Sequence, residues 1–176
     1  DWRFLMYAYK HAANQFAQDK NHIDTVLKLL YPYIANHSNK LGETALMLAA
    51  WYNLDVHIEE DILNESDDNP GNKLSELTKP NDKLHHYTAL DYALHIDDDH
   101  PVCKVKAAEA ILSYWLKHPQ GDQLLPLEQL VSSDEHRKEA CLVVASLLQD
   151  QAASFDLSKM GGEDLSSILF AFHQAY

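Results

Sequence analysis

The stretch GETALMLAAWYNLD, residues 42–55, decides the expected fold of this chain. Thr44 can cap a helix, and a run of leucine, methionine and alanine follows it. Small alanines let short helices stack closely, whereas leucines fill the layer between neighbouring helices. We therefore predict a short helix over residues 44–52. Trp51 and Tyr52 end this helix, where they either belong to the core or meet a partner.

The same pattern returns further along the chain. The stretch YTALDYAL, residues 87–94, repeats Thr-Ala-Leu at a distance of 88 − 44 = 44 residues. Weaker copies lie near residues 12, 125 and 164, so that successive copies are spaced by 32, 44, 37 and 39 residues. Self-similarity with a period of about 20–50 residues is typical of a repeat array.

Helical periodicity dominates the remaining sequence. Only 5 glycines and 6 prolines are present, which favours helices over a turn-rich β-fold. No convincing strand pattern occurs, and we expect Asp134 to cap one of the later helices. The predicted helices cover residues 3–18, 22–37, 44–52, 88–96, 102–116, 125–131, 135–153 and 165–174.

One segment interrupts this periodicity. Residues 55–68 contain seven acidic residues and no lysine or arginine, and a turn-rich stretch follows them. A charge block of this kind usually forms a solvated loop, although Ile58, Ile62 and Leu63 could make a short helix. We therefore expect an acidic insertion at about residues 56–86.

Composition limits the function. The chain has 176 residues, 46% of them hydrophobic, and a net charge of −13. Such a charge argues against nucleic acid or an anionic membrane surface as the main partner. No apolar run reaches the length of a membrane span. Cys103 and Cys141 lie on apolar helical faces, so we expect reduced, inert thiols in an intracellular protein.

Catalytic and metal-binding motifs are missing from the sequence. His85, His86, His95 and His100 lie close to the run 97–99 of aspartates, but no HxxxH or HExxH spacing occurs. GxSxG, P-loop and GxGxxG motifs do not occur either. We expect no catalytic residue, no metal and no cofactor in this chain.

Residues 21–50, NHIDTVLKLLYPYIANHSNKLGETALMLAA, resemble a junction between two ankyrin repeats. In that family an outer helix ends in paired leucines and a hairpin leads to the inner-helix motif. The residues that match are Leu29 and Leu30 for the paired leucines, and Gly42, Thr44, Leu46, Ala49 and Ala50 for the motif. The resemblance implies an all-α, ankyrin-type helical solenoid of about four to five degenerate repeats, forming one domain over residues 1–176.

The sequence departs from the family pattern at several positions. Ala45 and Ala89 stand in place of the motif proline. Met47 and Asp91 stand in place of the motif histidine, so its usual hydrogen bond is expected to be lost at Met47 and altered at Asp91. His86 replaces the hairpin glycine, where a positive φ strains a side chain, so we expect a reshaped hairpin.

The resemblance also implies a function, protein–protein recognition through the concave face of the array. Partners of ankyrin arrays contact hairpin tips and the exposed face of the inner helices. Here these positions are Trp51, Tyr52, Lys40, Leu41, Glu43, Leu84, His85, Tyr87, His95 and Ile96. Aromatic residues are enriched in binding hot spots. We expect a monomer that binds a protein partner with a basic or mixed-charge surface.

Two alternatives remain open. The chain can be the targeting half of a larger enzyme whose catalytic domain lies elsewhere, since it begins at Asp1 rather than methionine. It can also be a structural spacer or dimerisation module. Its degenerate repeats are similar in style to those of host-targeted proteins of intracellular bacteria, which would place a secreted effector in the host cytoplasm.

Overall fold

The computed structural model describes residues 2–13, 25–26, 28–31, 33, 37–63, 75–81, 86–95 and 105–175. Most of these residues are helical and none forms a strand; a single isolated bridge pairs Gln120 with Gln123. The predicted all-α class is therefore confirmed for this part of the chain. Leu84, His85 and Ile96, which were predicted to bind a partner, lie outside the described residues, as do Cys103 and the acidic stretch 64–74.

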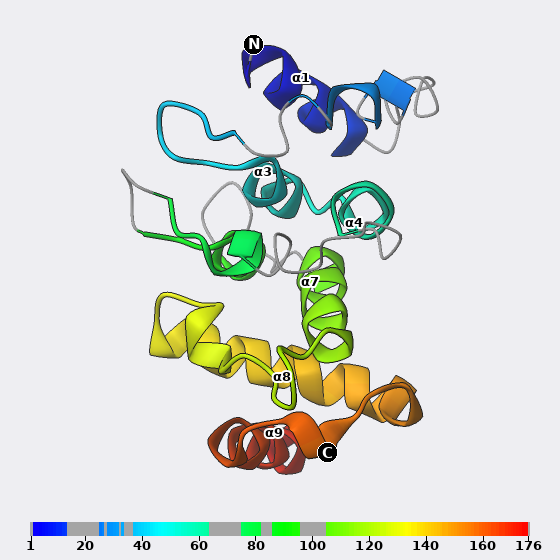
Figure 1. The fold of residues 1–176 in the computed structure, drawn as a ribbon, viewed down its shortest axis with the longest axis vertical. Coiled ribbons are helices and arrows are strands. Elements are labelled where there is room, and N and C mark those ends of the chain that lie inside the picture. The colour runs from blue at the N-terminus through cyan, green and yellow to red at the C-terminus, as the bar shows by residue number, and fades with distance from the viewer. Residues whose placement is uncertain are drawn as a thin grey trace.

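The helices follow one another along the long axis of the molecule in chain order, and α9 lies at the opposite end from α1 (Figure 1). Residues 25–26, 28–31, 33 and 75–78 are also helical. The elements are α1 (Trp2–Ala13), α3 (Ala45–Trp51), α4 (Asp55–His57), the π-helical η1 (Ile58–Ile62), α6 (Ala89–Leu94), α7 (Val105–Lys117), the 3-10 turn η2 (Leu127–Gln129), α8 (Asp134–Gln151), the 3-10 turns η3 (Ala152–Ser154) and η4 (Leu157–Lys159), and α9 (Gly162–Ala175).

Helices α3 and α6 begin with the same local structure. The Thr44 hydroxyl accepts a hydrogen bond from the Met47 amide at 3.3 Å, and the Thr88 hydroxyl accepts one from the Asp91 amide at 3.2 Å. In return, the Thr44 amide donates to the Met47 sulfur at 3.4 Å and the Thr88 amide to the Asp91 carboxylate at 2.8 Å. Both helices thus carry a reciprocal capping box. The residues that replace the motif histidine close these boxes.

Gly42 and His86, which precede these two helices at similar positions, share a left-handed backbone conformation. Gly42 has a φ of 82° and His86 a φ of 56°. Only glycine adopts this left-handed region without cost, although histidine enters it more readily than most residues. The expectation that the second hairpin is reshaped is therefore wrong at His86, which keeps the positive φ that glycine provides in the first.

An asparagine holds each hairpin closed. The Asn39 amide donates to the Glu43 carbonyl at 3.0 Å, and the Asn81 amide donates to the Tyr87 carbonyl at 2.9 Å. The side-chain oxygens accept in return, from Leu41 and Glu43 at Asn39 and from Tyr87 at Asn81. We call residues 39–51 the first unit, and residues 81 and 86–95 the second unit.

The two units pack through small and branched apolar side chains. Leu46 and Leu90 are fully buried, as are the alanines of α3 and α6. Ile58, Ile62 and Leu63 are also buried, so the start of the predicted acidic insertion belongs to the core and not to a solvated loop. The segment is rich in acidic residues, but its apolar residues recur at helical spacing and can therefore pack together on one side.

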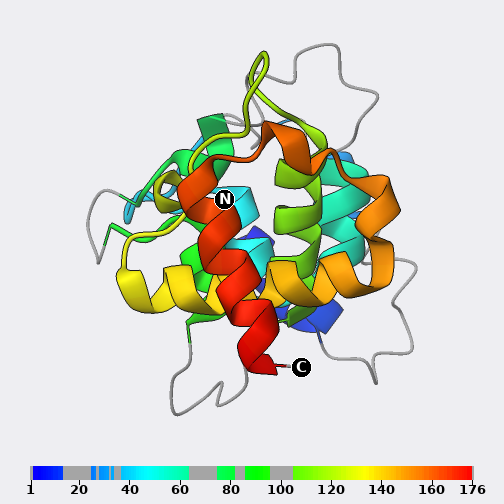
Figure 2. The same ribbon diagram turned by 90° about the horizontal axis from the view of Figure 1, so that it is seen from below.

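The C-terminal half differs from the predicted repeat register. The helix predicted over residues 125–131 is only a 3-10 turn, Leu127–Gln129, and no helix like α3 begins there. Helix α8 is capped by Ser133, whose hydroxyl accepts from the His136 amide at 3.2 Å, rather than by Asp134. Helix α9 crosses α8 at the end of the molecule (Figure 2).

A buried carboxylate fixes this C-terminal arrangement. Asp164 accepts a hydrogen bond from the Leu127 amide at 2.8 Å and an ion-pair contact from Arg137 at 2.9 Å. Arg137 also pairs with Glu163 at 3.0 Å. The first turn of α9, the turn η2 and helix α8 are therefore joined at one point, which the local sequence pattern did not indicate.

Candidate functional site

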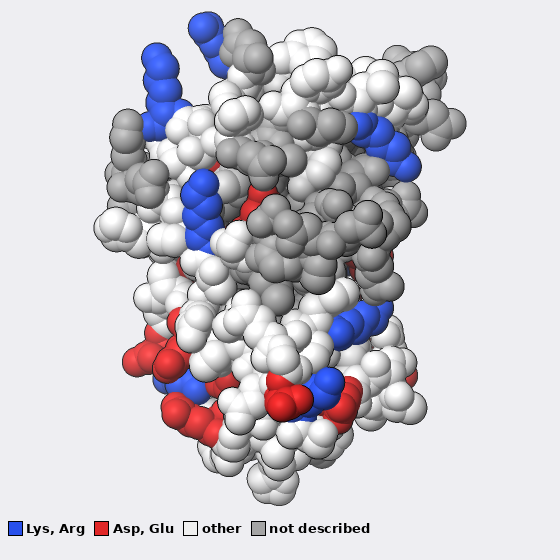
Figure 3. Space-filling view, viewed as in Figure 1, with Lys and Arg blue, Asp and Glu red and all other residues white. Residues whose placement is uncertain are grey.

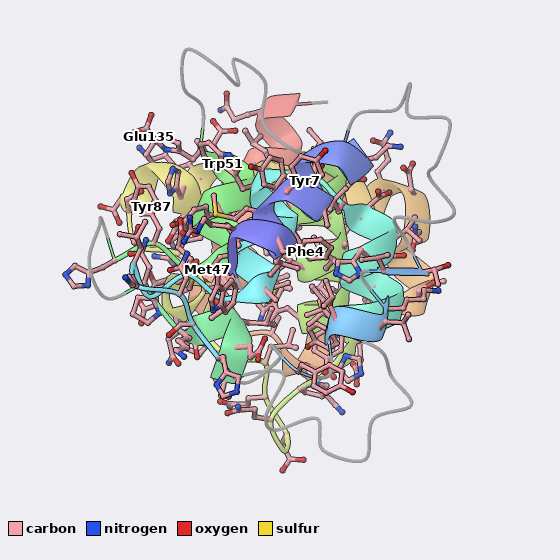
Figure 4. The ribbon with its side chains drawn as sticks, turned by 90° about the horizontal axis from the view of Figure 1, so that it is seen from above. Phe4, Tyr7, Met47, Trp51, Tyr87 and Glu135 are labelled. Carbon is pink, nitrogen blue, oxygen red and sulfur yellow. The ribbon has the colours of Figure 1, made fainter. Side chains whose placement is uncertain are left out.

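A cavity of about 270 Å³ lies beside α3 and α6. Its lining includes five of the residues predicted to bind a partner. Viewed along the long axis, the labelled residues Trp51 and Tyr87 lie on the same side of the molecule (Figure 4). The residues that line this cavity, which we call the aromatic pocket, are Met6, Glu43, Leu48, Trp51, Tyr52, Asn81, Tyr87, Tyr92 and His95.

The other predicted residues lie elsewhere. Lys40 and Leu41 form the tip of the first hairpin and are exposed, Leu41 at 42%. They do not line the aromatic pocket, but they lie on the same hairpin as Glu43. The predicted surface therefore divides into a pocket and an adjacent hairpin tip.

Four aromatic rings form a continuous cluster at the pocket. Trp51 stacks on His95 with ring centroids 6.0 Å apart and meets Tyr92 edge-on, also at 6.0 Å. Tyr87 contacts Tyr92 edge-on at 6.2 Å and His95 at 5.4 Å. These separations are those of favourable aromatic pairs, so the rings hold one another in place. Trp51 is half-buried, and it is neither a free surface residue nor a core residue.

The Glu43 carboxylate lines the pocket. Glu43 was predicted at an exposed hairpin tip, but it is only 8% exposed. One of its oxygens accepts from the Tyr92 hydroxyl at 2.8 Å, and the other accepts from the Asn39 side chain at 2.6 Å. The Asn81 side chain in turn donates to the Tyr92 hydroxyl at 2.9 Å. Polar side chains from both units thus hold Glu43 in one position.

The electrostatics of the pocket follow from this carboxylate. Burial and the hydrogen bond to Glu43 raise the pKa of Tyr92, and burial and the nearby Glu43 charge raise the pKa of Tyr52. Both phenols are therefore neutral at physiological pH. The same negative field favours a positive group inside the pocket, because opposite charges attract more strongly where water is partly excluded.

His136 on helix α8 supports the aromatic cluster. His136 contacts the Asp91 carboxylate through Nδ1 at 2.7 Å, and its ring lies 5.6 Å from Tyr87 and 6.3 Å from His95. Asp91 also accepts from the Ser132 amide at 2.9 and 3.0 Å. The aromatic cluster is thereby anchored to helix α8 and to Ser132 just before it.

Sequence reasoning missed several lining residues. Tyr92 follows Thr88 by four residues, as Leu48 follows Thr44, and both residues line the pocket. This shared register could have identified them, because equivalent positions of a repeat occupy equivalent places. Nothing in the sequence marked Met6 or Asn81.

Other reactive groups lie apart from the pocket. Burial raises the pKa of the Cys141 thiol, so this cysteine is a poor nucleophile at neutral pH. Within the described ranges, no group of three or more His, Cys, Asp or Glu side chains is placed to hold a metal ion. None of the described helices combines the length and apolar character needed to cross a bilayer.

The outer surface carries both signs of charge. On the face drawn in Figure 3, acidic side chains gather over the lower half with basic ones beside them, and the residues shown in colour form no continuous basic surface.

Comparisons with protein-family models, curated proteins and solved structures found no match for this chain. The aromatic pocket is therefore the main indication of what this chain does.

Proposed function

We propose that this chain is an ankyrin-type helical solenoid that recognises a partner protein through the concave face of its repeats. One observation carries the proposal. The equivalent ends of two successive units, Trp51 in the first and His95 in the second, meet in one half-buried aromatic pocket. In repeat arrays the scaffold is shared between units, while binding residues occupy the positions that differ.

The size of the pocket supports a protein partner. Sites for cofactors and drug-sized ligands usually span about 300–1,000 Å³, whereas this cavity of about 270 Å³ suits a single side chain. The exposed hairpin tip, Lys40 and Leu41, extends the contact surface beyond it. A buried anchor with a surrounding rim is the usual arrangement of an interface hot spot.

The charge supports a basic or mixed-charge partner. The chain carries a net charge of −13, and Glu43 adds a fixed negative charge inside the pocket. We propose that the chain acts as a monomer inside the cell, without a cofactor and without nucleic acid.

A capture experiment tests this function. The double variant Trp51→Ala with Tyr52→Ala is compared with the unaltered chain, both immobilised, in quantitative pull-downs from lysate. Tyr33→Ala serves as the matched control because Tyr33 is 78% exposed and does not line the pocket. We expect the double variant to lose its specific partners and the control to keep them. Equal capture by all three proteins would remove the proposal.

A second candidate function is self-association as a structural module. It is favoured by a groove of about 660 Å³ between α8 and α9, whose lining includes Leu142 and Phe170, the latter 65% exposed. Light scattering at increasing concentration distinguishes the two functions. A stable dimer that Phe170→Lys dissociates would support this second candidate, whereas a monomer at all concentrations would exclude it.

A further inference from the structure

We infer that the aromatic pocket binds an alkylammonium group, the side chain of a lysine on the partner, either unmodified or N-methylated. This inference rests on the proposed recognition function and names the chemical group that the pocket takes. It combines three properties of the pocket: its lining of aromatic faces, its fixed carboxylate and its small volume.

The aromatic lining provides faces for a cation. Trp51, Tyr52, Tyr87 and Tyr92 all line the cavity, and the ring contacts among Trp51, Tyr87 and Tyr92 fix their orientation. A cation over such a face, within about 6 Å of the ring centroid, is attracted by the negative π-cloud. Tryptophan gives the strongest attraction among the aromatic residues, so Trp51 is the principal face.

Glu43 provides the opposite charge. Each of its carboxylate oxygens already accepts one hydrogen bond, from Tyr92 or from Asn39. A carboxylate oxygen can accept more than one hydrogen bond, so capacity remains for a ligand. Because both partners hold the carboxylate in place, binding does not require it to become ordered.

The same features select among side chains. An acidic side chain would be repelled by Glu43. A guanidinium carries five N–H donors that need acceptors, more than the capacity that remains on Glu43 and the Asn81 amide oxygen, which already accept hydrogen bonds from Tyr92, Asn39 and Tyr87. An ammonium has three donors, and methylation removes them while keeping the positive charge. The pocket therefore suits lysine better than arginine.

The test is an NMR titration with capped tripeptides, acetyl-Gly-X-Gly-amide. X is lysine, trimethyl-lysine, arginine or norleucine, which has an uncharged side chain. The readout is the indole N–H signal of Trp51, assigned with the variant Trp51→Phe. We expect the lysine or trimethyl-lysine peptide to bind at least about tenfold more tightly than norleucine, as a partly desolvated cation–π contact implies. The tighter of the two identifies the source, unmodified or methylated lysine.

A pair of matched variants tests whether the charge of Glu43 contributes to binding. Glu43→Gln keeps the shape of the side chain and removes its charge, so binding of the ammonium peptide should fall by on the order of tenfold while norleucine is unaffected. Glu59→Gln makes the same change at an exposed position outside the pocket and should change nothing. Melting curves show whether each variant folds. The peptide comparison on the unaltered chain does not depend on any variant.

Three results would overturn the inference: equal binding of norleucine and the ammonium peptides, tighter binding of arginine, or no shift of the Trp51 signal with any peptide. The capture experiment distinguishes failure of the ammonium inference from failure of the proposed recognition function. If folded Glu43→Gln captures partners normally while Trp51→Ala with Tyr52→Ala does not, the ammonium inference fails and recognition stands. If the double variant captures normally, recognition itself fails.

Discussion

Asn39 and Asn81 show how single residues connect the scaffold to the pocket. Each closes a hairpin with its side-chain oxygen, and each uses its side-chain nitrogen to hold a group of the pocket, Glu43 in one case and Tyr92 in the other. A side-chain amide has both donors and an acceptor, so it can serve both purposes at once. The hairpin conformation and the position of the carboxylate are therefore coupled.

The Tyr92 hydroxyl is the central group of this network, which gives a first prediction. Tyr92→Phe should lower the free energy of unfolding by about 1–2 kcal/mol, because Glu43 and Asn81 each lose a buried hydrogen-bond partner. Urea denaturation measures the change. Tyr33→Phe is the control, since Tyr33 is exposed, and it should have no effect. Equal stability of Tyr92→Phe and the unaltered chain would show that water satisfies both groups.

His86 gives a second prediction at the same scale. Its φ of 56° costs a histidine conformational energy that glycine does not pay. His86→Gly should therefore raise stability, by up to about 1 kcal/mol after the greater freedom of glycine in the unfolded chain is subtracted. Gly42→Ala, at a φ of 82°, should have the opposite sign. Thermal melting of both variants measures the difference, and a destabilised His86→Gly would contradict this account.

At the scale of elements, Asp91 joins α6 to α8. Burial alone would raise its pKa, but hydrogen bonds from His136, Ser132 and Thr88 outweigh burial and lower it. The carboxylate therefore stabilises the fold in its charged form. The Thr88 hydroxyl adds a hydrogen bond to the Leu130 carbonyl at the same joint.

A pH dependence follows from this joint. Above the ordinary carboxyl pKa of 3.8 the stabilisation is fully present, because Asp91 is charged in both the folded and the unfolded chain. Below it the unfolded chain takes up the proton first, so stability falls until the pH passes the lowered folded pKa. Urea midpoints from pH 6 down to about pH 2.5 should therefore fall more steeply for the unaltered chain than for Asp91→Asn. Asp122→Asn, at an exposed turn, should keep the steep fall.

The elements themselves were predicted with uneven success. The helices α3, α6, α7, α8 and α9 were expected close to their observed bounds, because apolar spacing and capping residues act over only a few positions. At residues 125–131 a helix was predicted, and only the 3-10 turn Leu127–Gln129 forms. The Leu127 amide donates to Asp164, 37 residues further along, a contact that no local pattern reveals.

At the scale of the whole molecule, the helices contact mainly their neighbours along the long axis, α3 with α6, α7 with α8 and α8 with α9 (Figure 1). Stability in such an arrangement is approximately a sum of local and neighbouring contributions. The unfolding of one end therefore need not require the unfolding of the other.

Hydrogen exchange tests this independence. Leu90→Ala removes a fully buried side chain from α6 and should cost about 2–5 kcal/mol, with protection lost mainly in α3 and α6. Ile168→Ala, buried in α9, should instead lower protection mainly in α8 and α9. A uniform loss of protection across the chain in both variants would show that the molecule unfolds as a single cooperative unit.

The sequence by itself determined the helices, their threonine caps and the small apolar faces on which they pack, since these depend on residues a few positions apart. Its resemblance to ankyrin repeats also predicts that Trp51 contacts a partner. Only the tertiary structure decided that Glu43 is buried, because its partner Tyr92 is 49 residues away. It also decided that His136 supports the aromatic cluster, because its partner Asp91 is 45 residues away. Contacts over such distances form only when whole helices pack against one another, so no local pattern of residues records them.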